Sequence, residues 1–338
     1  MSAADASGLA DADRLAPWLK NTLGIEGPIA TCKIAGGQSN PTFLVDHPGG
    51  RLVLRRKPPG TLLKSAHAVE REFRVQSALA GRVPVARPLA ICEDDTVLGA
   101  AFFLMEHVEG ETHDDPSLPA LEPETRTRIY EAMARTLAAI HAVDLKAAGL
   151  SDYGPHGSYY GRQIARWSKQ YRASETEPQP DMEALMTRLA DAPPEDDGRV
   201  ALVHGDYRID NLIWRGTEVA AVCDWELSTL GHPLADLAQL VMQWQAEPGR
   251  EGRGLAGIDR AAAGIPTDEV FVALYAEAAG REVPDLSRHV AFAAFRMAAI
   301  LQGVKRRALD GNASDPERGM RLGRMVPVLA ALGLCYLR

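Results

Sequence analysis

Short spacing between strand-like segments near the N-terminus limits the folds open to this 338-residue chain. Three such segments cover residues 29–35, 41–45 and 51–56, and turns rich in glycine or proline separate them. A parallel pair of strands needs a crossover of about a dozen residues or more. The three segments are therefore expected to form antiparallel hairpins.

The remainder of the chain changes from strand-like to helical patterns. A helix is expected at about residues 66–80, and strands at 88–93 and 101–108. After Gly110 helical patterns dominate, with one short β-like region at residues 200–223. Helices are expected at residues 123–143, 159–171, 182–189, 234–245, 267–279, 286–309 and 317–332. The glycine- and charge-rich stretch 247–257 is expected to be a mobile loop. The sequence thus predicts an α+β fold with a sheet-rich first third and a larger helical remainder.

Composition narrows the class of protein. A hydrophobic content of 46% and a charged content of 24% are typical of globular chains. The net charge of -8 disfavours nucleic acid and anionic membranes as partners. The four cysteines form no CxxC pair, and residues 1–5 lack the features of a signal peptide, so we expect a cytoplasmic protein with reduced thiols.

A polar segment at residues 204–211, HGDYRIDN, carries the strongest chemical signal. Asn211 follows Asp206 by five residues, and Asp224 comes after two strand-like pieces at hairpin distance. Phosphoryl transfer needs a carboxylate that orients and deprotonates the attacking hydroxyl, and oxygen ligands that hold Mg²⁺ on the phosphates. Asp and Asn are also common in turns and caps, but His204 before the pair and Asp224 after it favour catalysis.

These residues resemble the aminoglycoside phosphotransferase and choline kinase-like family, relatives of the protein kinases. Four longer segments resemble a subgroup, the kinase-like domain associated with acyl-CoA dehydrogenases. They are LVLRRKPPG (52–60), HGDYRIDNLIW (204–214), CDWELSTLGHPLADLA (223–238) and AAILQGVKRRALDGNAS (298–314). The resemblance extends over about residues 29–323. It implies a two-lobed protein-kinase-like fold, with a nucleotide-clamp lobe at residues 1–106 and a catalytic and substrate lobe at 107–338.

The resemblance also implies roles for the polar segment. Asp206 corresponds to the catalytic base, Asn211 and Asp224 to the ligands of Mg²⁺, and His204 to a residue that braces the loop. Arg208 stands where protein kinases keep a lysine that neutralises the transferred phosphate, and the alternative is a surface arginine.

The first lobe is then expected to bind ATP. In the turn GGQSN at residues 36–40, Gly37, Ser39 and Asn40 would cover the phosphates with backbone N–H groups and the Ser39 hydroxyl. A Gly-Gly turn by itself is more often a plain hairpin. In the segment joining the lobes, residues 103–110, the Glu106 carbonyl and the Val108 amide would contact adenine.

A cation on the third strand should contact the α- and β-phosphates. The family pattern has lysine here, whereas this chain has Arg55, with Arg56 and Lys57 as neighbouring alternatives. Strand alternation puts Arg55 and Arg56 on opposite faces. The partner carboxylate on the following helix is Glu72 by motif alignment, with Glu70 as the alternative.

The predicted function is an ATP- and Mg²⁺-dependent kinase that phosphorylates a hydroxyl of a small molecule. Asp236 is expected to be structural and to hydrogen-bond the catalytic loop. The stretch after Leu286 carries a run of basic residues that would suit an anionic acceptor, such as a hydroxy acid or its CoA thioester. These are Arg288, His289, Arg296, Lys305, Arg306 and Arg307. The subgroup resemblance also implies a functional link to an acyl-CoA dehydrogenase.

Two other functions compete with this one. The first is a non-catalytic kinase-like module that binds nucleotide or acyl-CoA, which the absent third-strand lysine favours. The second is a metal-dependent phosphoesterase that uses His204, Asp206, Asp224 and His232 as ligands. The sequence does not distinguish ATP from GTP, and it does not give the oligomeric state.

Overall fold

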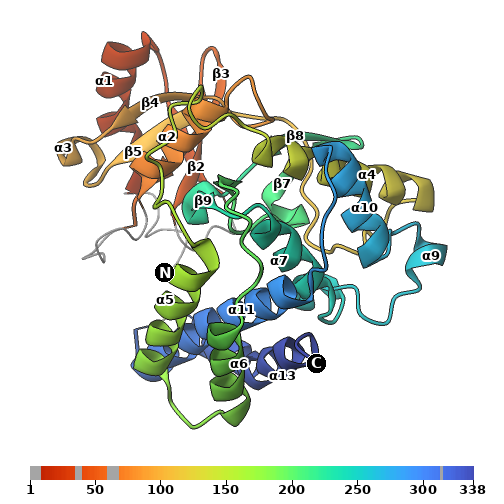
Figure 1. The fold of residues 1–338 in the computed structure, drawn as a ribbon. Helices are drawn as coiled ribbons and strands as arrows, with labels where there is room; N and C mark the ends of the chain where they lie inside the picture. Colours follow the sequence, from red (N-terminus) through yellow and green to blue (C-terminus); the bar gives the residue numbers. More distant parts are fainter. Residues whose placement is uncertain (1–8, 35–39, 59–67, 313–314) are drawn as a thin grey trace. The chain divides into compact units, whose positions relative to one another are not determined.

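The computed structural model describes residues 9–34, 40–58, 68–312 and 315–338, and its chain groups into two compact units (Figure 1). The first unit comprises Met1–Thr112, Lys146–Leu150 and Asn211–Leu227. The second comprises His113–Leu145, Ser151–Asp210 and Ser228–Arg338. The expected single division after residue 106 is simpler than this interleaved arrangement, and it stays a prediction.

An antiparallel sheet with the order β1-β2-β3-β5-β4 forms the centre of the first unit. Its strands are β1 (Ala30–Lys33), β2 (Thr42–His47), β3 (Gly50–Arg56), β4 (Pro88–Cys92) and β5 (Phe102–Glu106). Every pairing in this sheet is antiparallel, which confirms the hairpins expected from the short spacing. The strand β3 lies between β2 and β5, so both of its edges are paired.

Each face of the sheet carries its own apolar cluster. Leu52 and Leu54 of β3 pack with Leu15 and Leu19 of α1 (Ala12–Leu23). On the other face, the helix α2 (Val69–Leu79) packs against β5. The short helix α3 (Asp95–Leu98) contacts α1. Alternation along β3 therefore directs neighbouring side chains to two different helices.

A second hairpin belongs to the first unit although it comes much later in the sequence. It consists of β7 (Leu212–Arg215) and β8 (Glu218–Val222), followed by the 3-10 turn η3 (Trp225–Leu227). Glu111 forms a two-way backbone bridge with Trp214, and the Val222 amide donates to the Pro84 carbonyl at 2.9 Å. These backbone hydrogen bonds join the hairpin to the first unit.

The second unit is mainly helical. Its helices are α4 (Pro123–His141), α5 (Tyr159–Ser174), α6 (Pro180–Asp191), α7 (Leu234–Trp244), α8 (Gly249–Gly252), α9 (Arg260–Ala263), α10 (Asp268–Ala279), α11 (Ser287–Leu309), α12 (Pro316–Gly323) and α13 (Met325–Cys335). The long helix α11 (Figure 1) contacts α5, α6, α7, α12 and α13, and it supplies more residues to the main apolar cluster of this unit than any other element. A small sheet pairs β6 (Ala201–Val203) with β9 (Thr229–Gly231). The 3-10 turn η2 (Ile209–Asn211) follows the segment after β6.

One sequence expectation about the second unit is wrong. The helix expected at residues 317–332 is two helices, α12 and α13, which meet at Arg324. In α12, a Cβ at Gly323 would lie 2.7 Å from the Lys305 side chain, so this helix packs closely on α11 and the chain then changes direction. The stretch 247–257, which is expected to be a mobile loop, contains the short helix α8 and several backbone hydrogen bonds, described further below, and its mobility stays a prediction.

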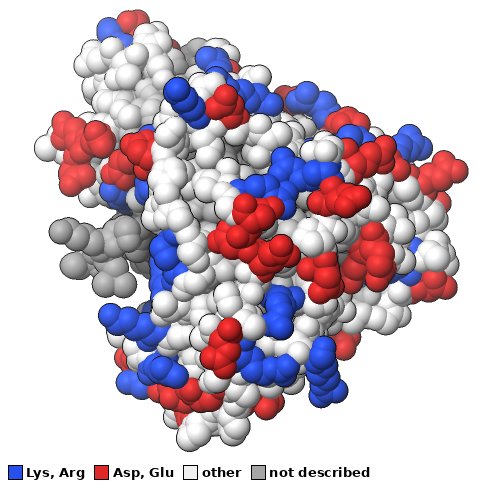
Figure 2. All heavy atoms as spheres, in the orientation of Figure 1, with Lys and Arg blue, Asp and Glu red and all other residues white. Residues whose placement is uncertain are grey.

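On the face shown in Figure 2, basic and acidic side chains are interspersed. Of the helices in the described ranges, none combines the length and apolar character needed to cross a membrane.

Candidate active site

A buried ion pair occupies the centre of the first unit. Arg55 Nε lies 2.6 Å from Glu72 Oε2, and Arg55 Nη2 lies 2.7 Å from Asp224 Oδ1. The Glu72 side chain is 1% exposed and that of Arg55 is 12% exposed. A carboxylate of the helix α2, a guanidinium of β3 and a carboxylate after β8 thus meet at one point.

Strand alternation explains why Arg55, rather than its neighbours, makes these contacts. Arg56 points to the opposite face, where its guanidinium donates to the Leu98 carbonyl at 2.7 Å. Lys57 pairs with Glu70, the other glutamate considered for this site. The two candidate pairs are therefore separate, and the buried one is Arg55 with Glu72.

Part of the glycine turn lies outside the described residues. This holds for Gly37 and Ser39. Asn40 is described and is 1% exposed, and its side-chain amide donates to Glu72 Oε1 at 2.6 Å. The Asn40 side chain therefore holds Glu72 in place, a contact that the sequence did not reveal.

The surroundings of Glu72 change its acidity. The pKa of Glu72 is raised to about 7: burial is the largest cause, and the nearby Asp224 and Glu226 carboxylates act in the same direction. Arg55 and the Asn40 amide act in the opposite direction. The desolvation of a carboxylate inside the protein is the larger effect here.

The hairpin β7–β8 brings the two predicted metal ligands together at its open end. The Cys223 amide donates to the Asn211 carbonyl at 2.8 Å, and Leu212 pairs with Val222. Asp224 has a φ of 63°, which few residues other than glycine adopt. Such strain is concentrated at functional sites, so the backbone of Asp224 supports its selection from sequence.

The catalytic loop of the second unit is held by a buried carboxylate. Asp236 of α7 accepts hydrogen bonds from the His204 amide at 2.7 Å and the Gly205 amide at 2.8 Å. His141 lies 3.2 Å from the same carboxylate. Burial would raise the pKa of Asp236, but these hydrogen bonds and the nearby His204 hold it below its ordinary value. The structural role expected for Asp236 is confirmed.

Arg296 is a loop-holding residue whose role the sequence analysis missed. It is 8% exposed, and it donates to the Gly205 carbonyl and to the Gln239 side chain, each at 3.0 Å. The Asp206 amide, in the same peptide unit as that carbonyl, donates to His204 Nδ1 at 3.2 Å. Both polar ends of the peptide before Asp206 are therefore fixed. An arginine within the apolar run AFAAFRMAAI was the available signal.

Ion pairs surround Asp206 on its own loop. Arg208 Nε lies 3.2 Å from Asp206 Oδ1, and Arg208 Nη2 lies 3.2 Å from Asp210 Oδ2. The Asp206 side chain is 22% exposed, so the carboxylate remains accessible to a substrate. Arg208 is 19% exposed and engaged with two carboxylates, which differs from a plain surface arginine.

The basic residues after Leu286 do not form one anion-binding surface. Arg296 is buried against the catalytic loop, and His289 is 2% exposed. Lys305 pairs with Glu177 at 2.5 Å, and Arg306 pairs with Asp310 at 3.0 Å. The inference of an anionic acceptor from this cluster is withdrawn.

The predicted adenine-contacting segment begins at the end of the sheet. Glu106 is the last residue of β5, and its side chain pairs with Arg87. Val108 lies two residues further on, outside the strand. A backbone that continues beyond the end of a strand can present its polar groups to a planar ring, as the proposed contact requires.

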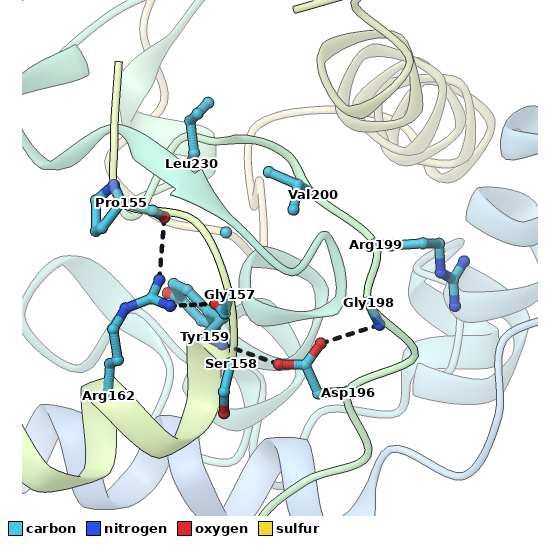
Figure 3. A pocket seen from close by; sticks show the side chains of 11 residues that line it. Pro155, Gly157, Ser158, Tyr159, Arg162, Asp196, Gly198, Arg199, Val200 and Leu230 are labelled. Atoms are coloured by element: carbon cyan, nitrogen blue, oxygen red, sulfur yellow. Dashed lines mark hydrogen bonds between the residues drawn. The ribbon is translucent and has the colours of Figure 1, made fainter. Parts of the chain in front are cut away.

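The second unit contains a cavity of about 300 Å³ near the start of β6 (Figure 3). Asp196 accepts hydrogen bonds from the Tyr159 and Gly198 amides. The Arg162 guanidinium turns toward backbone carbonyls of the preceding loop, and Leu230 adds an apolar surface. This volume is at the lower end of the range for small-molecule sites.

Two features are typical of protein-kinase-like phosphotransferases. One is the buried Arg55–Glu72 pair on the antiparallel sheet, and the other is the HGDYRIDN loop held by a buried aspartate. The sequence model of the phosphotransferase enzyme family matches residues 31–268, and the chain therefore belongs to that family.

Individual relatives agree with this membership. Acyl-CoA dehydrogenase family member 10 of Mus musculus is 44% identical over 329 residues, which are 95% of this chain but 30% of that protein. The chain thus spans less than a third of that relative. The crystal structure of a proposed aminoglycoside phosphotransferase from Ralstonia eutropha JMP134 is 45% identical, with a TM-score of 0.87 over 96% of this chain and 98% of its own.

A more distant structure shows the same fold. A thermostable mutant of the aminoglycoside phosphotransferase APH(4)-Ia, in ternary complex with AMP-PNP and hygromycin B, is 16% identical. Its TM-score is 0.62, and the match covers 96% of this chain and 99% of that one. The expected fold class and the resemblance to aminoglycoside phosphotransferases are confirmed.

Proposed function

We propose that this protein is an ATP- and Mg²⁺-dependent kinase that transfers the γ-phosphate to a hydroxyl of a small molecule. The observation that carries the proposal is the contact of Arg55 with both Glu72 and Asp224. A strand cation fixed by a helix carboxylate next to a metal-binding aspartate is the arrangement that holds nucleotide phosphates in kinases. Arginine supplies the charge that lysine provides in the family pattern.

The side chains at the hairpin end fit a magnesium ion. Asn211 and Asp224 offer an amide oxygen and a carboxylate, and Mg²⁺ prefers oxygen ligands of this kind together with phosphates and water. The Asp224 side chain is 35% exposed and so is open to a ligand. When bound, Mg²⁺ would neutralise phosphate charge and orient the phosphate for in-line attack.

The remaining roles follow from the protein's own groups. Asp206 accepts the proton of the acceptor hydroxyl and directs its oxygen at the γ-phosphorus. Arg208 exchanges its ion pair with Asp206 for one with the transferred phosphoryl group, and Arg55 binds the α- and β-phosphates. Transfer is direct, with no covalent enzyme intermediate.

Nucleotide recognition is assigned to the first unit. The backbone of the turn with Gly37, Ser39 and Asn40 would cover the phosphates, and the Glu106 carbonyl and Val108 amide would contact the base. The relative in complex with AMP-PNP supports nucleotide use by this fold. ATP is proposed as the donor, and a cytoplasmic location is consistent with it.

A hydroxy acid or hydroxyacyl-CoA is the proposed acceptor class. Its support is the similarity to a protein named as an acyl-CoA dehydrogenase family member, which also suggests a functional link to such a dehydrogenase. The basic residues of α11 no longer support it. The cavity of about 300 Å³ is a candidate site for the non-reacting part of the acceptor.

The proposal is tested by measuring ADP formation from ATP and Mg²⁺ against hydroxy acids, their CoA esters, choline and aminoglycosides. We expect turnover with at least one compound, and its loss in Asp206→Ala with unchanged thermal unfolding. Activity on an aminoglycoside alone would refute the hydroxyacyl class. Nucleotide binding with no turnover on any compound would favour the non-catalytic alternative.

A further inference from the structure

Backbone hydrogen bonds give the segment between α7 and α9, which includes the short helix α8, a compact form. The Gly254 amide donates to the Glu247 carbonyl at 2.9 Å, and the Leu255 amide donates to the Trp244 carbonyl at 3.0 Å. A Cβ at Gly252 would lie 2.1 Å from the Glu247 carbonyl oxygen, a distance that excludes any side chain. The glycines that suggested mobility are therefore required for close packing of the backbone.

Arg253 is the strained residue of this loop. Its φ is 56°, in the left-handed region that costs a residue other than glycine free energy. The tight packing on either side of Arg253 holds it there. Its guanidinium leaves the loop toward the catalytic loop, where Arg253 Nη1 lies 2.9 Å from Asp210 Oδ2.

A row of ion pairs connects Arg253 to Asp206. Asp210 Oδ2 receives both Arg253 at 2.9 Å and Arg208 at 3.2 Å, and Arg208 in turn lies 3.2 Å from Asp206. Asp210 is 11% exposed, so solvent screens these contacts less than it screens a surface pair. Burial raises the pKa of Asp210, and the two arginines oppose this rise.

We propose that Arg253 is a positioning residue for phosphoryl transfer, which fixes Asp210 and through it the position of Arg208. The inference rests on the proposed kinase function. A direct role of the two arginines in binding an acceptor anion does not fit, because the hollow that they line holds only about 10 Å³. A space of this size accepts at most one water molecule.

The test compares Arg253→Gln, Asp210→Asn and the double variant in Mg-dependent ADP release from ATP. We expect each single variant to lower kcat about tenfold or more, the equivalent of one charge-assisted hydrogen bond. The KM for ATP should change less than about twofold, because nucleotide contacts are untouched. The double variant should be no slower than either single variant, because both interrupt one row of contacts. Arg253→Lys should restore part of the rate.

The matched control is Arg281→Gln, which replaces an exposed arginine just after α10. This substitution should leave kcat unchanged. An unaltered kcat in Arg253→Gln, or additive losses in the double variant, would overturn the inference while leaving the kinase proposal intact. If the wild-type protein binds Mg-ATP but releases no ADP under any condition, the kinase proposal fails, and this inference fails with it. If Arg253→Gln does not fold, the same comparison of kcat and KM for ATP is made with Asp210→Asn alone. An unaltered kcat in that variant would then overturn the inference.

Discussion

Arg55 shows how one residue can tie together distant parts of a sequence. It belongs to β3, yet it contacts Glu72 of α2 and Asp224, which lies 169 positions further along the chain. Burying the Glu72 carboxylate against the Arg55 guanidinium is costly unless the geometry satisfies both groups. The arrangement is therefore better explained by a task at this site than by a gain in stability.

Removing the Arg55 charge should make stability depend strongly on pH. In Arg55→Met, Glu72 loses its cation, so its pKa should rise above the value of about 7 that it has in the native site. The unfolded carboxyl titrates near 4.5, so the native state binds the extra proton and stability falls as pH rises above 4.5. Urea unfolding should show a loss of about 3–5 kcal/mol near pH 8 and a smaller loss near pH 6. The double variant with Glu72→Gln should show little of this pH dependence; an equal loss at both pH values would contradict the account.

The sequence allowed site residues to be predicted in those places where a motif has a fixed spacing. Arg55 and Glu72 were selected by their place in the family pattern, and geometry pairs them. Arg296 was misjudged because it was grouped with the other basic residues of its helix, although its place in the apolar run AFAAFRMAAI indicated burial. Its contacts with Gln239 and with the Gly205 carbonyl, 91 positions away, distinguish it from the others.

At the scale of elements, local patterns were informative and long-range pairings were not. The strands of the main sheet were expected within a few residues of their bounds, because hairpins depend on adjacent sequence. The strand β9 was not anticipated, since it has three residues and forms only by pairing with β6. The close packing of the glycines after α7 was not anticipated, because glycine permits both mobility and close packing and sequence alone does not distinguish them.

Helix α11 carries a histidine that should make the second unit sensitive to acid. Burial lowers the pKa of His289 to about 4, against an ordinary value of 6.5. Below pH 6.5 the unfolded chain gains a proton that the folded chain does not, so stability should fall between pH 6.5 and 4, by roughly 3 kcal/mol at most. Chemical unfolding of His289→Phe should show a flatter dependence in this range. An unchanged slope would show that other groups cause the acid sensitivity.

At the scale of the whole molecule, the two units are built from segments that alternate along the chain. The segment up to Asp210, which includes the catalytic loop, belongs to the second unit, and the segment that follows it, Asn211–Leu227, belongs to the first. The predicted base Asp206 and the predicted metal ligands Asn211 and Asp224 thus belong to different units, although Asp206 and Asn211 are five residues apart. All three residues lie within positions 204–224 of the sequence, which is why a sequence motif was able to identify them.

The most direct test of the account separates the roles of these aspartates. ATP binding by calorimetry and ADP formation are measured with and without Mg²⁺ for the wild-type protein, Asp206→Asn and Asp224→Asn. The account predicts that Asp206→Asn retains Mg-dependent ATP binding and loses at least about a hundredfold in turnover, the lower range for a general base. Asp224→Asn should lose the effect of Mg²⁺ on binding as well. Near-normal turnover in Asp206→Asn, or undiminished Mg-dependent binding in Asp224→Asn, would contradict the assignment of the site.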